Sequence, residues 1–189
     1  SIPNITQKNI VITAGRVRKA KGQHILVKAM LPILKEHQDW ALAIVGKVDK
    51  ASFLEELKQL VNASNVENQV YFVNETSDIR SYYQASKIAV TPSFSEGFSL
   101  VTAEAMACAC TVIATAGVGV HSDLIRHADN GYLVEAGAIS ELQELLKNTI
   151  TGKLPFLGTS ARKTIIANWS AQHEAENLMN LYKPMLKEV

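Results

Sequence analysis

The sequence has almost no net charge and no long apolar run. Its 19 lysines and arginines nearly balance its 18 aspartates and glutamates, which leaves a formal net charge of +1. This balance provides no overall field that would recruit nucleic acid or a membrane surface, so we expect no nucleic-acid partner. The apolar stretches are far shorter than the roughly 20 residues of a membrane-spanning helix, and the first residues show no signal-peptide pattern. The composition, 47% apolar and 20% charged, is typical of a globular protein.

Cysteine is also scarce, and the two thiols, Cys108 and Cys110, are separated by one residue. A disulfide and half of a metal site are two interpretations. Cysteines at this spacing bond poorly in regular structure, and no second cysteine pair or nearby histidine completes a zinc site. We therefore expect two small buried side chains where a helix meets a strand, and a reducing compartment.

Short apolar segments rich in β-branched residues recur along the chain. Because they are nearly continuous in apolar residues, they predict strands that are buried on both faces, as in a parallel sheet. The expected strands cover residues 9–15, 40–46, 69–73, 87–92, 111–115 and 131–135. Between them lie segments with helical spacing, so strands and helices alternate.

The expected helices cover residues 22–37, 52–61, 79–83, 99–109 and 139–146, with a short one before residue 131 and two more over 159–168 and 171–187. Pro32 predicts a kink or an early break in the first helix, and Ser52 with Glu55 predicts a capping box at the second. The whole pattern predicts a single α/β domain over residues 1–189. Its core is a doubly wound, parallel, six-stranded Rossmann-like sheet with helices on both faces, closed by the two C-terminal helices.

A dinucleotide-binding oxidoreductase would share this sheet, but it needs the sequence G-x-G-x-x-G after the first strand. The turn at that place reads AGRVRKAKG, and the GVG at 117–119 follows a later strand but lacks the third glycine. The sequence therefore disfavours this class of enzyme.

The basic segment AGRVRKAKG, residues 14–22, follows the first expected strand, and open parallel sheets bind their ligands at the carboxyl ends of strands. Gly15 permits a tight turn, Gly22 precedes the helix, and four cations lie between these glycines: Arg16, Arg18, Lys19 and Lys21. Guanidinium and ammonium groups together suit a phosphate or a diphosphate. A solvated basic turn is the alternative interpretation.

The segment FSEGFSLVTAE, residues 94–104, follows the fourth expected strand. A helix that starts near Phe98 or Ser99 leaves free N–H groups that form an anion site, and these belong to Gly97, Phe98, Ser99 and Leu100. Gly97 lets a ligand approach the main chain closely, and Glu96 is placed to accept hydrogen bonds from hydroxyl groups.

Glu104 is expected five residues into this helix, among small apolar residues. A carboxylate buried there needs a partner, either a lysine or arginine of the protein or the hydroxyl groups of a ligand. Two carboxylates that flank an anion-binding helix start, beside a basic loop, fit a ligand with a central diphosphate and hydroxylated groups at both ends. Nucleotide-sugars have this shape.

The sequence resembles the C-terminal, donor-binding half of family-4 (group 1) retaining glycosyltransferases of the GT-B fold. The similarity extends from about residue 8 to the end. It rests on Gly15-Arg16 with Lys21-Gly22, on the E-x7-E pair Glu96 and Glu104, and on the segments TVIAT (111–115) and NGYLV (130–134). The E-x7-E pair in its context is the specific part of this match, since the glycine–cation pairs alone are common.

The resemblance implies a role for each matching residue. Arg16, beside Gly15, and Lys21 would hold the diphosphate and stabilise the charge that develops on it during transfer. Glu96, with the amides of Gly97 and Phe98, would orient the hydroxyl groups of the donor sugar. The catalytic residues would thus be Arg16, Lys21 and Glu96.

The rest of the donor would be bound by further residues. The amides of Ser99 and Leu100 would face the distal phosphate, Glu104 would accept hydrogen bonds from the ribose hydroxyls, and the base would lie near Asn74 and Thr76. The sequence has no D-x-D motif, so the resemblance implies that no metal cofactor takes part and that side chains and the helix dipole stabilise the phosphates.

The chain departs from the family pattern at three places. Ser99 stands where glycine is usual, and Asn74 also replaces a common glycine, which bears on the expected base site. The loop AGVGVHSD, residues 116–123, is longer by one than the usual GGxPE loop and has Asp123 where glutamate is common. His121 in this loop is either a determinant of a sub-class preference or an ordinary loop histidine.

As a whole, the resemblance implies retaining transfer of a sugar from a nucleotide-diphosphate donor to a glycan or lipid-linked acceptor, in polysaccharide or lipopolysaccharide biosynthesis. The enzyme would be cytoplasmic, and peripheral attachment to the inner face of the cytoplasmic membrane would be compatible with this resemblance. The acceptor would bind to an N-terminal domain that is absent from these 189 residues, so we expect the chain alone to be inactive. A non-catalytic sugar-nucleotide sensor or binding module is the alternative.

Overall fold

The computed structural model describes residues 5–7, 9–97 and 99–169. Six parallel strands form one sheet in the order β3-β2-β1-β4-β5-β6. The strands are β1 (Asn9–Ala14), β2 (Trp40–Val45), β3 (Val70–Val73), β4 (Ile88–Thr91), β5 (Thr111–Thr115) and β6 (Tyr132–Val134). This arrangement confirms the predicted six-stranded, doubly wound sheet.

Helices cover both faces of the sheet, as the sequence predicts. They are α1 (Gln23–Glu36), α2 (Ala51–Asn62), α3 (Ile79–Ala85), α4 (Leu100–Ala107), α5 (His121–Leu124), α6 (Ile139–Ile150) and α7 (Gly158–Trp169). Two short 3-10 turns, η1 (Lys19–Lys21) and η2 (Glu67–Gln69), complete the described elements. The second of the two expected C-terminal helices, over 171–187, lies outside the described residues.

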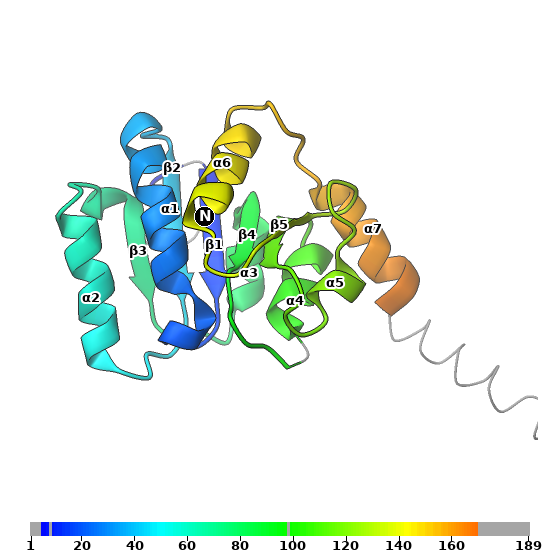
Figure 1. The fold of residues 1–189 in the computed structure, drawn as a ribbon, viewed down its shortest axis with the longest axis horizontal. Coiled ribbons are helices and arrows are strands. Elements are labelled where there is room, and N and C mark those ends of the chain that lie inside the picture. The colour runs from blue at the N-terminus through cyan, green and yellow to red at the C-terminus, as the bar shows by residue number, and fades with distance from the viewer. Residues whose placement is uncertain (1–4, 8, 98, 170–189) are drawn as a thin grey trace, which may run out of the picture.

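Alternate residues of each strand point into two separate cores. Val11 and Leu42 belong to the core beneath α1, α2 and α6, which lie in front of the sheet in Figure 1, whereas Ile12 and Ala43 belong to the core beneath α3, α4 and α7. Burial on both sides explains why the strand sequences are continuous in apolar residues. Successive side chains of a strand alternate between the two faces, and here both faces are covered.

Two local features of the helices were predicted from single residues. Helix α1 has no early break at Pro32 but continues to Glu36, because Met30, Ile33 and Leu34 around the proline are all buried against the sheet. Helix α2 begins at Ala51 with Lys50 as its N-cap, and no side chain caps it. Ser52 therefore lies inside the first turn and does not form the expected capping box with Glu55.

The two cysteines lie at the junction of α4 and β5. Cys108 follows the last helical residue and Cys110 precedes the strand; both thiols are free, and Cys110 is fully buried. The Cys110 thiol donates a hydrogen bond to the carbonyl of Tyr83 at 3.1 Å. The prediction of a small buried side chain is thus confirmed for Cys110, whereas Cys108 is only partly buried. In the part of the chain that the structure describes, no helix is long and apolar enough to cross a membrane.

Candidate functional site

The strand order reverses between β1 and β4, and the loops that follow these two strands meet there. We call residues 15–22 the basic loop and residues 92–99 the glutamate turn. The amide of Phe94 donates a hydrogen bond to the carbonyl of Ala20 at 2.9 Å. Gly22 has a positive φ of 70°, and a Cβ atom on it would lie 1.9 Å from the Pro92 carbonyl oxygen. The two loops therefore touch backbone to backbone, at the position where open α/β sheets bind ligands.

The basic loop is fixed by contacts to its own backbone and to the next strand. The Gln23 side chain donates to the carbonyl of Arg16 at 2.9 Å and accepts a longer bond from the Arg18 amide. The guanidinium of Arg16 lies 3.1 Å from a carboxylate oxygen of Asp49, and its side chain remains 61% exposed. Asp49, which follows β2, was not identified from the sequence, although its position beyond the carboxyl end of a neighbouring strand was a usable signal.

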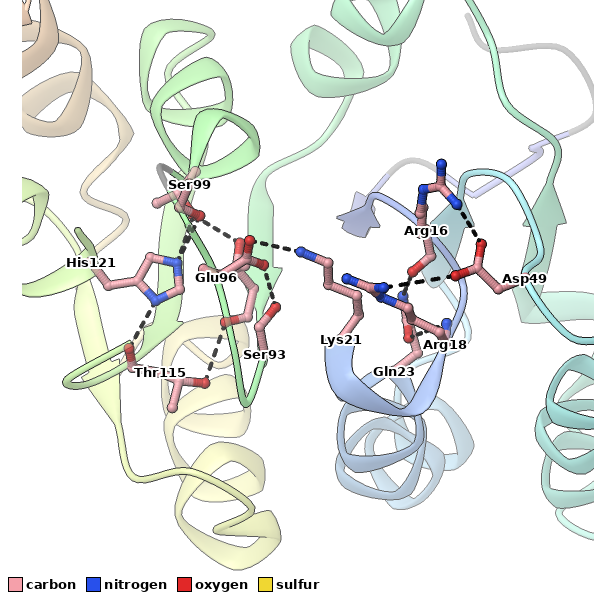
Figure 2. Close-up of polar contacts among 12 residues, drawn as sticks. Arg16, Arg18, Lys21, Gln23, Asp49, Ser93, Glu96, Ser99, Thr115 and His121 are labelled. Atoms are coloured by element: carbon pink, nitrogen blue, oxygen red, sulfur yellow. Dashed lines mark hydrogen bonds and ion pairs between the residues drawn. The ribbon is translucent and has the colours of Figure 1, made fainter. Parts of the chain in front are cut away.

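Lys21 and Glu96 form an ion pair between the basic loop and the glutamate turn (Figure 2). The Lys21 Nζ atom lies 2.7 Å from Glu96 Oε2, and the two side chains are only 19% and 7% exposed. The hydroxyl of Ser93 donates to the other oxygen, Oε1, at 2.6 Å. The structure thus brings together two of the predicted catalytic residues that are 75 positions apart in the sequence.

The glutamate turn presents free main-chain N–H groups. Helix α4 begins at Leu100, slightly later than predicted, and Ser99 is its N-cap. The amides of Gly97, Ser99 and Leu100 donate to no described residue. A Cβ atom on Gly97 would meet no other atom within 4 Å, so the space beside this glycine is open. Phe98, the fourth residue of the predicted anion site, lies outside the described residues.

Glu104 lines a cavity of about 280 Å³ at the carboxyl ends of β1 and β2, which we call the Glu104 cavity. Arg16 and Thr76 also line this cavity, and so does Gly15. Asn74, the other predicted base-site residue, lines a separate hollow beside β3. The cavity also includes Glu75, which the sequence analysis did not single out.

Glu104 is not buried among the small apolar residues that flank it in the sequence. Its side chain is exposed, because its face of α4 is turned toward the cavity while the flanking Ala105 is buried. The carboxylate of Glu104 has no ion pair or hydrogen bond to any described residue, so no lysine or arginine of this part of the chain is its partner. Partial desolvation raises the pKa of the carboxyl group.

His121 is not an ordinary loop histidine. It is the first residue of α5 and is fully buried. Its Nδ1 atom lies 2.8 Å from the Thr115 carbonyl oxygen, and its Nε2 atom lies 2.8 Å from Ser99 Oγ (Figure 2). Burial lowers the pKa of the imidazole, which favours its neutral form. Its surroundings could not be read from the sequence because they depend on a loop that folds over the glutamate turn.

The chemical groups of the basic loop, the glutamate turn and the Glu104 cavity suit an anion with hydroxylated groups attached. Two cations, Arg16 and Lys21, and the free amides at the start of α4 offer hydrogen-bond donors, while the unpaired carboxylate of Glu104 offers acceptors. No group of three or more side chains that could hold a metal ion occurs among the described residues.

The comparisons with known proteins identify glycosyltransferases. The family model described as "Glycosyl transferases group 1" matches residues 1–168. A lipopolysaccharide core biosynthesis mannosyltransferase from Rhizobium leguminosarum bv. viciae is 30% identical over 183 residues, which are 95% of this chain and 52% of that protein. A capsular polysaccharide biosynthesis glycosyltransferase from Staphylococcus aureus is 28% identical, over 92% of this chain and 46% of its own length. The chain spans about half the length of the curated relatives that it matches.

Solved structures agree with the sequence matches. The C-terminal domain of a glycosyl transferase group 1 family protein from Francisella tularensis superimposes with a TM-score of 0.83 at 30% identity, and covers 88% of this chain and 89% of that domain. Anabaena HepE in complex with UDP and glucose gives a TM-score of 0.74 at 27% identity, over 92% of this chain and 49% of that protein.

Proposed function

Because the chain belongs to the group 1 glycosyl transferases, we propose that it supplies the donor site of an enzyme that transfers a sugar from a nucleotide-diphosphate donor with retention and without a metal ion. One observation carries this proposal. The basic loop, the open start of α4 and the Glu104 cavity adjoin one another at the point where the strand order reverses. This arrangement gives the three parts of a nucleotide-sugar separate places on one surface.

The diphosphate would lie between the basic loop and the start of α4. The guanidinium of Arg16 and the ammonium of Lys21 supply two positive charges. The amides of Gly97, Ser99 and Leu100 supply N–H donors that have no acceptor among the described residues. Groups that are already fixed in place stabilise charge that develops on a leaving phosphate at little cost in reorganisation. They would provide the stabilisation that a metal ion provides in other nucleotide-sugar enzymes.

The nucleoside would occupy the Glu104 cavity. A carboxylate that is free of protein partners can accept hydrogen bonds from two neighbouring ribose hydroxyls, and the base would extend toward Thr76 on the opposite wall. Asn74, the other residue of the predicted base site, lines the adjacent hollow and would contact only the edge of the base.

Glu96 would orient the donor sugar. Each oxygen of its carboxylate already accepts one hydrogen bond, from Lys21 or from Ser93, and each keeps a further lone pair for a sugar hydroxyl. Lys21 would lie between this carboxylate and the diphosphate, so that the charge on the departing phosphate is stabilised close to the bond that breaks.

The acceptor would be a glycan or a lipid-linked sugar, in polysaccharide or lipopolysaccharide biosynthesis. One of the relatives described above is named for lipopolysaccharide core biosynthesis and another for capsular polysaccharide biosynthesis, and the chain covers about half of each. The acceptor would therefore bind to an N-terminal domain that pairs with this one. We place the enzyme in the cytoplasm, with peripheral membrane contact made through that other half.

Calorimetric titration of the purified chain with UDP, GDP and ADP tests the donor site. One nucleotide should bind with a dissociation constant between about 1 μM and 1 mM. The substitution Glu104→Ala should weaken it roughly 10- to 100-fold, because hydrogen bonds to a charged group contribute about 1.5–3 kcal/mol. Glu55→Ala removes an equally exposed carboxylate from α2 and should leave the affinity unchanged. Lack of binding by all three nucleotides, or equal binding by Glu104→Ala, would overturn the proposal.

A further inference from the structure

Two buried polar side chains from different segments are in direct contact beside the proposed phosphate site. Ser99 lies at the start of α4, and His121 belongs to the loop 116–123. The structure places the Ser99 hydroxyl 2.8 Å from the Nε2 atom of His121, and both side chains are almost completely buried (Figure 2). The two side chains therefore form one hydrogen-bonded unit.

The two partners of the His121 ring determine which atom donates each hydrogen bond. A main-chain carbonyl can only accept, so the Nδ1 atom of His121 must carry the proton that it shares with Thr115 at 2.8 Å. In a neutral imidazole the Nε2 atom is then an acceptor, and the Ser99 hydroxyl donates to it. Thr102 Oγ1 lies 2.9 Å from Ser99 Oγ, which keeps the hydroxyl within the protein interior.

This orientation is unusual for a serine at an N-cap. Such a serine normally turns its hydroxyl toward the amides of the first helical turn and accepts a hydrogen bond from one of them. Ser99 is the N-cap of α4, yet its side chain makes no capping hydrogen bond. Of the two amides that such a hydroxyl reaches, that of Thr102 donates to the Ser99 carbonyl at 3.1 Å, and that of Val101 has no acceptor among the described residues. The amides of Ser99 and Leu100 have no acceptor among these residues either.

A backbone contact holds the histidine loop in place. Gly119, with φ of 53°, packs so closely on the glutamate turn that a Cβ atom would lie 2.5 Å from the Gly97 carbonyl oxygen. The loop 116–123 thus packs on the glutamate turn, and His121 of this loop contacts Ser99.

We propose that His121 is a positioning residue of the phosphate site: it holds the Ser99 hydroxyl away from the start of α4, so that the amides there remain open to the distal phosphate of the donor. The inference rests on the proposed function, since it assumes that a nucleotide diphosphate binds at this helix start. Without His121 the serine would turn and cap the helix at the amide of Val101, and its hydroxyl would then occupy space at the helix start that the phosphate needs.

A double-mutant cycle with two ligands tests this role. The nucleoside diphosphate that binds best to the wild-type chain is titrated by calorimetry beside its own monophosphate, for His121→Phe with Ser99 present and again in the Ser99→Gly background. With Ser99 present, His121→Phe should weaken the diphosphate about tenfold and change the monophosphate less than about twofold. In the Ser99→Gly background the same substitution should change the diphosphate less than about twofold, because no hydroxyl is left to cap the helix.

A matched control is His37→Phe at the C-cap of α1, beside the amino end of β2 and thus at the opposite edge of the sheet from the site. It should change neither affinity. If His121→Phe does not fold, His121→Asn replaces it in the same cycle, since the shorter amide cannot reach both partners, and the same split between the two ligands is expected.

Each outcome decides between the two claims. Equal losses for diphosphate and monophosphate, or no rescue in the Ser99→Gly background, would show that His121 acts only on the fold, while the binding of nucleotide by the wild type would still support the donor site. A wild-type chain that binds the diphosphate no more tightly than the monophosphate would also overturn the inference. Absence of any nucleotide binding would overturn the proposed function itself.

Discussion

Lys21 and Arg16 belong to the same basic loop, yet their surroundings differ. The Lys21–Glu96 pair is mostly buried, while the side chain of Arg16 is 61% exposed beside Asp49. An exposed ion pair contributes at most about 1 kcal/mol to stability, whereas removing one partner of a buried pair costs on the order of 3 kcal/mol or more. The two cations therefore differ in what they contribute to the fold, even though both are proposed to bind the diphosphate.

We expect Arg16→Ala and Lys21→Ala to separate binding from stability. Both should weaken nucleotide diphosphate binding, but urea unfolding should detect a loss on the order of 3 kcal/mol for Lys21→Ala and at most about 1 kcal/mol for Arg16→Ala. Lys19→Ala is the matched control, because Lys19 lies in the same loop and its 3.5 Å pair with Glu56 is exposed. It should affect neither quantity. Equal losses of stability in the Arg16 and Lys21 variants would contradict this account.

The buried imidazole of His121 predicts how stability depends on pH. Burial lowers its pKa from the ordinary 6.5, so the folded protein takes up this proton at a lower pH than the unfolded chain does. The stability that the neutral imidazole contributes is present above about pH 6.5 and is lost as the pH falls toward the lowered pKa. The nearby Glu96 raises this pKa and Lys21 lowers it, and both effects are smaller than that of burial.

Urea unfolding between pH 5 and pH 8 of the wild type and of His121→Phe measures this contribution as a difference. The wild type should lose more stability than the variant below about pH 6.5. His24, whose pKa is also lowered by burial, is present in both proteins and cancels. Parallel pH profiles would mean that the imidazole does not titrate in the way its burial implies.

At the scale of elements, much of the fold follows from patterns that the sequence displays directly. Continuous apolar strands with amphipathic helices between them predict the parallel sheet, since only a sheet covered on both faces buries such strands. The ends of elements were less predictable. Pro32 lies inside α1 because packing of its neighbours outweighs the local cost, and Ser52 does not cap α2 because Lys50 already occupies that position.

The candidate site shows the same division. That the basic loop and the glutamate turn lie side by side follows from the parallel sheet, because the carboxyl ends of neighbouring strands share one edge. Three side-chain contacts in the site were not predicted: Lys21–Glu96, Arg16–Asp49 and His121–Ser99. Each joins residues of different loops through side-chain conformations, and no periodicity in the sequence encodes such contacts.

The junction of the two loops can be tested through Gly22. Substitution Gly22→Ala places a Cβ atom at a position 1.9 Å from the Pro92 carbonyl oxygen, with φ at 70°. The left-handed backbone alone costs an alanine roughly 1–2 kcal/mol, and the overlap adds about 1–3 kcal/mol. Gly152→Ala has a similar φ of 77° and open space, so it should show the backbone cost alone.

Thermal unfolding and nucleotide titration of both variants provide the measurement. Gly22→Ala should be the less stable of the two. It should also bind nucleotide diphosphate more weakly, because the basic loop and the glutamate turn that meet at Gly22 form the proposed site. If the two variants are equally stable, the close approach of the basic loop to the glutamate turn does not exist in solution.

At the scale of the whole molecule, two of the four large apolar side chains that are exposed among the described residues lie beside the site. Leu100 at the start of α4 is 60% exposed, and Phe94 in the glutamate turn is 45% exposed. The chain also covers only about half of its curated relatives, and the matching crystal structure from Francisella tularensis is of a C-terminal domain. These observations support the proposal that another domain faces this edge of the sheet and carries the acceptor.

We therefore expect the isolated chain to bind nucleotide and to transfer no sugar. Every group assigned to it acts on the donor, and none of the described residues has been assigned to an acceptor hydroxyl, so a bound donor would face water. The purified chain is incubated with the nucleotide-sugars of whichever base binds in the titration, together with a lipopolysaccharide core fraction, and products are followed by mass spectrometry. The chain joined to the proposed N-terminal domain serves as the control and should form a glycosylated product under the same conditions. Transfer by the isolated chain would show that the acceptor site lies within these 189 residues and would refute the two-domain account.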